Sequence, residues 1–126
     1  MKKNLALVLI TLLCVGIVTS AKTKKVKLTG VVVDKACSAK LSKKDNVQEA
    51  VLGHTKKCAL MDACEKSGYG VFVDGKFYEF DAKGNGLAKA LIEKSTMDKG
   101  IKLAVKAKAD DANPTSLMVS KISAAK

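Results

Sequence analysis

The sequence predicts a small β-barrel of the OB-fold type, with five strands and a cysteine-bearing helical insertion after the first strand. Three observations favour it. Short stretches of alternating apolar and polar residues recur along the chain, Asp74-Gly75 marks a tight hairpin, and one helical pattern separates the third predicted strand from the fourth. This order matches the OB-fold, a partly open Greek-key barrel. A five-stranded sheet packed on helices is the alternative.

The N-terminal 21 residues are predicted to be a secretory signal peptide. Lysines precede the uncharged apolar run Leu5–Val18, and small residues follow it. The run is short for a membrane span, so no transmembrane segment is expected in the mature chain. An uncleaved membrane anchor is the alternative. We therefore expect a periplasmic or secreted protein in which residues 22–126 form one domain and Cys14 is removed.

The chain is strongly basic, which bears on its partners. All 23 basic residues are lysines, and the formal net charge is +11. Such a charge favours anionic partners, for example an anionic envelope surface. The lysines are scattered, however, and arginine, the usual bidentate reader of phosphate groups, is absent. We therefore expect no specific nucleic-acid binding.

The first half of the mature chain predicts one strand and a helical region. Val26–Asp34 is rich in β-branched residues and predicts the first strand, which leads directly to Cys37. From Asp45, a good N-cap residue, a helical pattern continues to Gly68, with Gly53 as a break.

The second half predicts a hairpin, a helix and two strands. The two-residue turn at Asp74-Gly75 puts five residues on the core face of the hairpin: Tyr69, Val71, Val73, Tyr78 and Phe80. A short helix follows over 85–95. The stretch 101–109 alternates cleanly, with its apolar residues inward and its lysines outward, and 116–123 predicts the last strand.

Several of these motifs together resemble a known family. The stretches "GVVVDKAC", "HTKKCALMDAC" and "SGYGVFVDGKFYEFDAKGN" are similar to those of small, secreted, uncharacterised bacterial OB-fold-like proteins. That family has a G-x-V-x-D-x-x-C … H … C … C pattern and a C-terminal GK-Y hairpin. The resemblance covers nearly the whole mature chain and implies a fold and a compartment, but no activity.

The cysteines allow a structural role. Cys37, Cys58 and Cys64 remain after cleavage of the signal, an odd number in an oxidising compartment. On a continuous helix, Cys58 and Cys64 would lie about 9 Å apart along the axis, too far for a disulfide. A bridge from Cys37 to either one would close a loop of roughly 20 to 27 residues and contribute about 3 kcal/mol.

The same stretch is also a candidate site for a soft metal ion. A continuous helix would put His54, Cys58 and Met61 in one stripe, because they are spaced by four and three residues. With Cys64, Cys37 could complete a set of three cysteines and one histidine, which suits Zn²⁺. With Met61, it could instead complete a thiolate, imidazole and thioether set, which suits copper as Cu(I). A disulfide-stapled helix and a metal-binding cluster both remain open.

We expect a protein that is not an enzyme, because no nucleophile, base and oxyanion donors assemble in the sequence. The alternative function is a binding module for an anionic polymer or an oligosaccharide. OB-folds bind such ligands over strands 2 and 3, where Phe72 and Phe77 form a candidate stacking pair. Local core formation accounts for the same rings.

Overall fold

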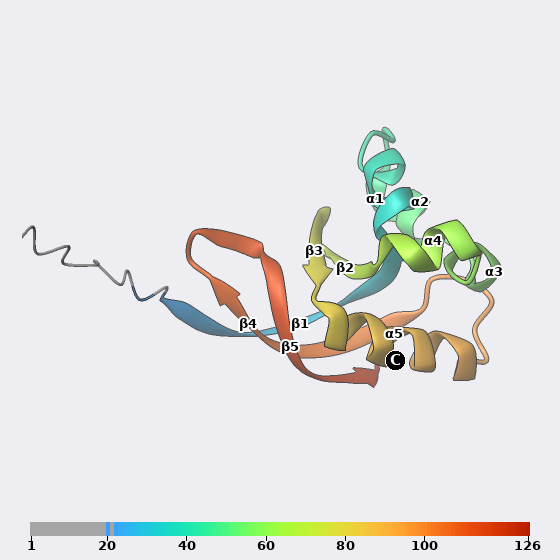
Figure 1. Ribbon diagram of the computed structural model, residues 1–126. Coiled ribbons are helices and arrows are strands. Elements are labelled where there is room, and N and C mark those ends of the chain that lie inside the picture. The colour runs from blue at the N-terminus through green and yellow to red at the C-terminus, as the bar shows by residue number, and fades with distance from the viewer. Residues whose placement is uncertain (1–19, 21) are drawn as a thin grey trace, which may run out of the picture.

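The computed structural model describes residue 20 and residues 22–126 (Figure 1). The predicted signal peptide, with Cys14, lies outside the described residues except for residue 20. The elements are β1 (Thr23–Asp34), α1 (Lys35–Leu41), α2 (Val47–Leu52), α3 (Lys56–Ala59), α4 (Asp62–Ser67), β2 (Tyr69–Val73), β3 (Lys76–Phe80), α5 (Ala82–Lys94), β4 (Lys102–Asp110) and β5 (Asn113–Ala124). In the part of the chain that is described, no helix is long and apolar enough to cross a membrane.

The five strands form a closed barrel in the order β1-β2-β3-β5-β4, and β4 pairs back to β1. Neighbouring strands are antiparallel except β3 and β5, which are parallel. The predicted OB-fold-like barrel with a helical insertion after the first strand is therefore confirmed.

The interior of the barrel follows the predicted alternation. In β4, Leu103, Val105 and Ala107 are buried, whereas the lysines of the opposite face, Lys102, Lys106 and Lys108, are exposed. The hairpin face predicted as core is likewise buried or packed against the core. α5 adds Ala88 and Ile92, both fully buried, to the same cluster. The barrel thus has one apolar core that β4, the hairpin and α5 share.

The hairpin turns at the predicted position. Asp74 and Gly75 have φ values of 49° and 76°, as a type I′ turn requires at both central residues. The register pairs Val73 with Lys76 and Phe72 with Phe77. A two-residue turn therefore fixes which side chains of β2 and β3 share a face.

α5 begins earlier than the sequence predicts. Its N-cap is Asp81, whose side chain accepts the backbone N–H of Gly84 at 2.9 Å. Asn85, where the predicted helix begins, instead accepts the backbone N–H of Tyr69 through its side-chain oxygen at 2.8 Å. Asn85 therefore ties α5 to the start of β2.

The four short helices between β1 and β2, residues 35–67, are called the helical cap here. They gather at one end of the barrel, away from the β4–β5 turn (Figure 1). Apolar residues of α1 and α2 pack on the outer surface of β1 and β2, in a cluster of Val31, Val33, Leu41, Val47, Val51 and Phe72. The cap therefore shares a second, smaller apolar core with the barrel.

Candidate metal centre

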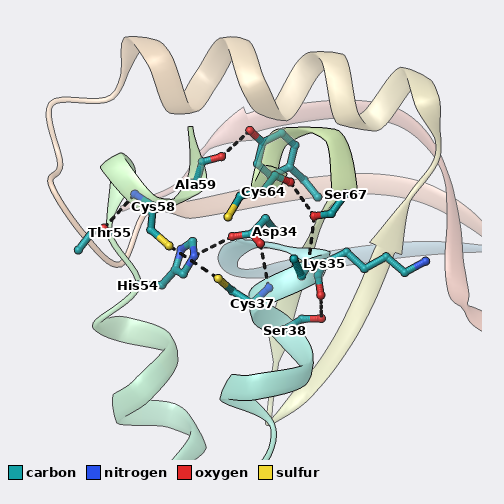
Figure 2. Close-up of polar contacts among 12 residues, drawn as sticks. Asp34, Lys35, Cys37, Ser38, His54, Thr55, Cys58, Ala59, Cys64 and Ser67 are labelled. Atoms are coloured by element: carbon teal, nitrogen blue, oxygen red, sulfur yellow. Dashed lines mark hydrogen bonds and ion pairs between the residues drawn. The ribbon is translucent and has the colours of Figure 1, made fainter. Parts of the chain in front are cut away.

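The centre starts at Asp34, the last residue of β1, which is fully buried. Its Oδ1 accepts the backbone N–H of Cys37 at 2.8 Å, so Asp34 is the N-cap of α1. A run of buried valines fixes the end of β1, and the cap bond fixes the first turn of α1. Together they place the Cys37 side chain next to the Asp34 carboxylate (Figure 2).

His54 reaches the same carboxylate from the turn between α2 and α3. Its Nε2 donates to Oδ2 of Asp34 at 2.9 Å, and both side chains are buried. The backbone carbonyl of His54 accepts the N–H of Gly100, which ties this turn to the segment before β4. The predicted ligand His54 is therefore hydrogen-bonded to Asp34, and it is not one of the four residues whose donor atoms all lie within 4.8 Å of one another.

Three sulfur atoms meet beside this pair. Cys37 and Cys58, from α1 and α3, lie 3.7 Å apart at their Sγ atoms. Cys64, from α4, is buried, and its sulfur points towards the same centre (Figure 2). The three sulfurs and an oxygen of Asp34 all lie within 4.8 Å of one another. No disulfide joins Cys37, Cys58 and Cys64.

A continuous helix from His54 to Cys64, the condition of the spacing arguments, does not form. Thr55 caps α3 by accepting the backbone N–H of Cys58, α3 ends at Ala59, and Met61 is extended at the start of α4. Because the chain turns between α3 and α4, Cys58 and Cys64 approach each other instead of lying about 9 Å apart along one helix axis.

Met61 lies outside the cluster for the same reason. It is the residue before α4, and its exposed fraction is 55%. The expected stripe of His54, Cys58 and Met61 therefore does not form. The cluster instead contains Asp34, which the sequence pattern did not indicate as a ligand. In the sequence, Asp34 can be recognised by its position three residues before Cys37, which is the spacing of an N-cap contact.

Tyr69 holds the turn between α3 and α4 against the barrel. Its hydroxyl donates to the carbonyl of Ala59 at 2.8 Å from a buried position at the start of β2. Burial raises the pKa of Tyr69 to about 12, so the hydroxyl keeps its proton at neutral pH. This bond fixes the end of α3, and with it the position of Cys58.

Charge in the centre is set by burial and by the Asp34–His54 contact. Burial raises the pKa of Asp34, but the hydrogen bonds from His54 and Cys37 outweigh it and leave that pKa below its ordinary value of 3.8. Burial raises the pKa of the Cys37 and Cys64 thiols, and the nearby Asp34 charge raises both further. A metal ion must therefore displace thiol protons, so its affinity is expected to fall as the pH falls.

The spacing of the donors fits a tetrahedral metal ion. Two thiolates bound to Zn²⁺ at about 2.3 Å with a tetrahedral angle are about 3.8 Å apart. The separation of Cys37 and Cys58, 3.7 Å, is close to this value. Three sulfurs and one carboxylate oxygen give four donors, which is the usual number at a structural zinc site.

One side of the centre opens to a hollow of about 360 Å³. Cys37 and Cys58 line this hollow, with Lys40 and Lys44 also on its wall. Cys64 and Asp34 are buried behind them. A metal ion or an oxidant would therefore approach from the side of Cys37 and Cys58.

The second predicted site, the aromatic pair of the hairpin, lies partly under the helical cap. Phe72 has an exposed fraction of 4% and belongs to the cluster shared by cap and barrel. Phe77 is half-buried, and its ring lies over Gly70, where a Cβ would meet it at 2.5 Å. The two ring centroids are 5.4 Å apart and tilted by 51°. The rings thus pack on each other and on the cap.

Comparisons with protein-family models, with curated proteins and with solved structures find no match. The geometry of the centre is therefore the basis on which a function is proposed.

Proposed function

We propose that the protein is an exported, non-catalytic metal-binding protein whose ion is held by the thiolates of Cys37, Cys58 and Cys64. The observation that carries the proposal is the convergence of these sulfurs with the Asp34 carboxylate, all within 4.8 Å, from the end of β1 and from α1, α3 and α4. Thiolates are the ligands that Zn²⁺ and Cu(I) prefer.

The donor set favours Zn²⁺ over Cu(I). Zn²⁺ accepts thiolate and carboxylate ligands together, whereas Cu(I) prefers sulfur alone. Met61, the thioether that would favour copper, is exposed and outside the cluster. In a zinc site, Asp34 is the fourth ligand and His54 orients its carboxylate, as outer hydrogen bonds do in other metal sites. In a Cu(I) site, only the three sulfurs bind.

The ion would join the end of β1 to three helices of the cap. Each cap helix has seven residues or fewer, which is too short to be stable alone in water. Because Cys37 and Cys58 line the hollow, the ion also stays reachable from solvent. A stapling role and reversible uptake of metal are therefore compatible at this site.

Metal titration of the reduced protein tests the proposal. With a competing chromophoric chelator, we expect about one Zn²⁺ per chain, and a loss of affinity of roughly tenfold or more for Cys58→Ser and for Cys64→Ser. Met61→Leu is the matched control and should bind like the wild type, because Met61 is outside the cluster. Asp34→Asn should weaken Zn²⁺ binding but leave Cu(I) binding unchanged if the carboxylate is a zinc ligand.

Two results would contradict the proposal. If Cys64→Ser binds Zn²⁺ and Cu(I) as tightly as Met61→Leu does, the cluster is not the site. If the reduced wild type takes up neither metal ion, the cysteines have another role.

A disulfide between Cys37 and Cys58 is the second candidate function. These two sulfurs are 3.7 Å apart and border the hollow, whereas Cys64 is buried. Oxidation would form the S–S bond, release two protons and two electrons to an oxidant such as a second disulfide, and remove two of the metal ligands. Intact mass before and after reduction, with peptide mapping, shows which of the two states the isolated protein has.

A further inference from the structure

A set of lysines on the outer surface of β1, β4 and β5 stands apart from the metal centre. Five exposed lysines share this surface, called the lysine face here: Lys25, Lys27, Lys106, Lys108 and Lys121. The three strands extend together beyond the rest of the barrel, on the side away from the helical cap (Figure 1).

The pairing register puts these lysines directly opposite one another. Lys25 pairs with Lys108, and Lys27 pairs with Lys106, which in turn pairs with Lys121 across β4 and β5. Like charges directly opposite each other destabilise an antiparallel pair of strands. The lysine face therefore has a cost in folding free energy.

No ion pair in the described part of the chain offsets that cost. None of the five ammonium groups takes part in an ion pair there. Asp110 is the last residue of β4, but its carboxylate accepts the backbone N–H of Ala112 in the turn, at 2.9 Å. Charge of one sign is thus concentrated on this surface.

The lysine face is also hollowed. Two shallow hollows, of about 450 and 270 Å³, lie on it and share Lys27 and Lys106 in their walls. Lys25 and Lys108 line the first hollow, and Lys121 lines the second. Because they share part of their walls, the two hollows are adjacent, and together they are called the depression here.

We propose that the lysine face binds a linear phosphate polymer along this depression. Successive lysines on β1, and likewise on β4, are two residues apart, about 6.7 Å. A flexible chain can therefore contact the lysines of both strands in turn. A lysine ammonium acts as a point charge and binds phosphate without fixed geometry, so the contact is independent of sequence. The proposal does not rest on the metal centre.

A lipid surface fits this region less well. Among the described residues that line the depression, Met118 is the one large apolar side chain that is exposed, with an exposed fraction of 46%. Helices and segments that lie in membrane interfaces bury several apolar residues along with their basic ones. A depression with charged walls instead suits a narrow chain that can enter it.

Binding of inorganic polyphosphate by the purified protein, followed over a range of salt concentrations, tests the proposal. The test variant is Lys27→Gln/Lys106→Gln/Lys121→Gln. The control Lys43→Gln/Lys66→Gln/Lys83→Gln removes the same charge from exposed lysines of the cap and α5. We expect the test variant to bind at least tenfold more weakly and the control within about twofold of the wild type. The salt slope should fall by roughly 2 in the test variant, at about 0.7 per neutralised phosphate.

The remaining results separate the proposal from its rivals. The melting temperature of the test variant should stay the same or rise, because opposed charges have been removed. Equal losses in the two variants would mean that net charge alone attracts the polymer, which overturns the proposal. Equally tight binding to phosphatidylglycerol vesicles, lost in the same variant, would assign the lysine face to a membrane and overturn it as well.

Discussion

The carboxylate of Asp34 links the two halves of the metal centre, because one oxygen holds Cys37 and the other holds His54. A buried carboxylate is costly unless its hydrogen bonds are made, and here both oxygens have partners. The orientation of the Asp34 carboxylate therefore depends on His54. In the proposed zinc site His54 is a positioning residue, whereas the sequence suggested a ligand.

We predict that His54→Ala lowers the free energy of unfolding by about 1–3 kcal/mol at pH 7, because it leaves buried Asp34 without its ring partner. The variant should also change the response to acid. In the wild type the pKa of Asp34 is below 3.8, so its stabilising contribution is present above that pH and is lost as the pH falls through the folded-state value. Without His54, burial is expected to raise the pKa of Asp34. The variant should therefore lose less of its unfolding free energy at low pH than the wild type does.

Urea unfolding at pH 7 and at several values between pH 2 and 5 measures both effects. Asp34→Asn is the matched comparison, because it keeps an N-cap side chain but does not titrate. A His54→Ala variant with the same acid dependence as the wild type would contradict the role given to the Asp34–His54 contact.

Single residues were predictable where their chemistry is rare in the chain. The histidine and the cysteines stand out because thiols and imidazole are unusual in so lysine-rich a sequence. Asp34 does not stand out, because in the sequence it is simply the polar residue that ends a run of valines. Its role follows from two contacts, one local to α1 and one from a residue twenty positions away.

At the scale of elements, the strands followed from the sequence better than the cap did. β4 alternates and the β2–β3 hairpin has its turn residues, so local pattern and tertiary burial agree. In the cap, the stretch from Thr55 to Ser67 has helical spacing throughout, but Thr55 caps one helix and Met61 is extended before the next. The break lets Tyr69 bond to Ala59 and lets Cys64 face Cys58, and neither contact has the spacing of neighbours on one helix.

We predict that Zn²⁺ stabilises the cap selectively. At a free Zn²⁺ concentration roughly a hundred times its Kd, states that release the ion should become about a hundredfold rarer, which corresponds to about 2.7 kcal/mol. Amide hydrogen exchange of the reduced protein should slow in residues 35–67, and a chelator should reverse the change. Amides of β4, which has no ligand, are the internal control. Protection that rises equally in β4 and in the cap would contradict a site confined to the cap and the end of β1.

For the whole molecule, the order of elements determined the barrel, but not which surface the insertion would cover. Strands 2 and 3 carry the usual binding surface of OB-folds, and in this chain α1 and α2 pack beside them on Phe72. The sequence shows the length of the insertion and its apolar residues, but the surface they cover depends on where β1 ends and on how the cap folds back. The open charged surface is therefore on the other side, on β1, β4 and β5.

This arrangement makes Phe72 a structural residue, which gives the last prediction. Phe72→Ala should cost about 3–5 kcal/mol of unfolding free energy, as expected for a buried aromatic ring. Phe77→Ala should cost less, because Phe77 is half-buried. Polyphosphate binding by both folded variants should match that of the wild type, since neither ring belongs to the lysine face. Urea unfolding and the same binding assay measure the two effects. Weaker polymer binding by Phe77→Ala without a loss of stability would instead assign the aromatic pair to ligand stacking.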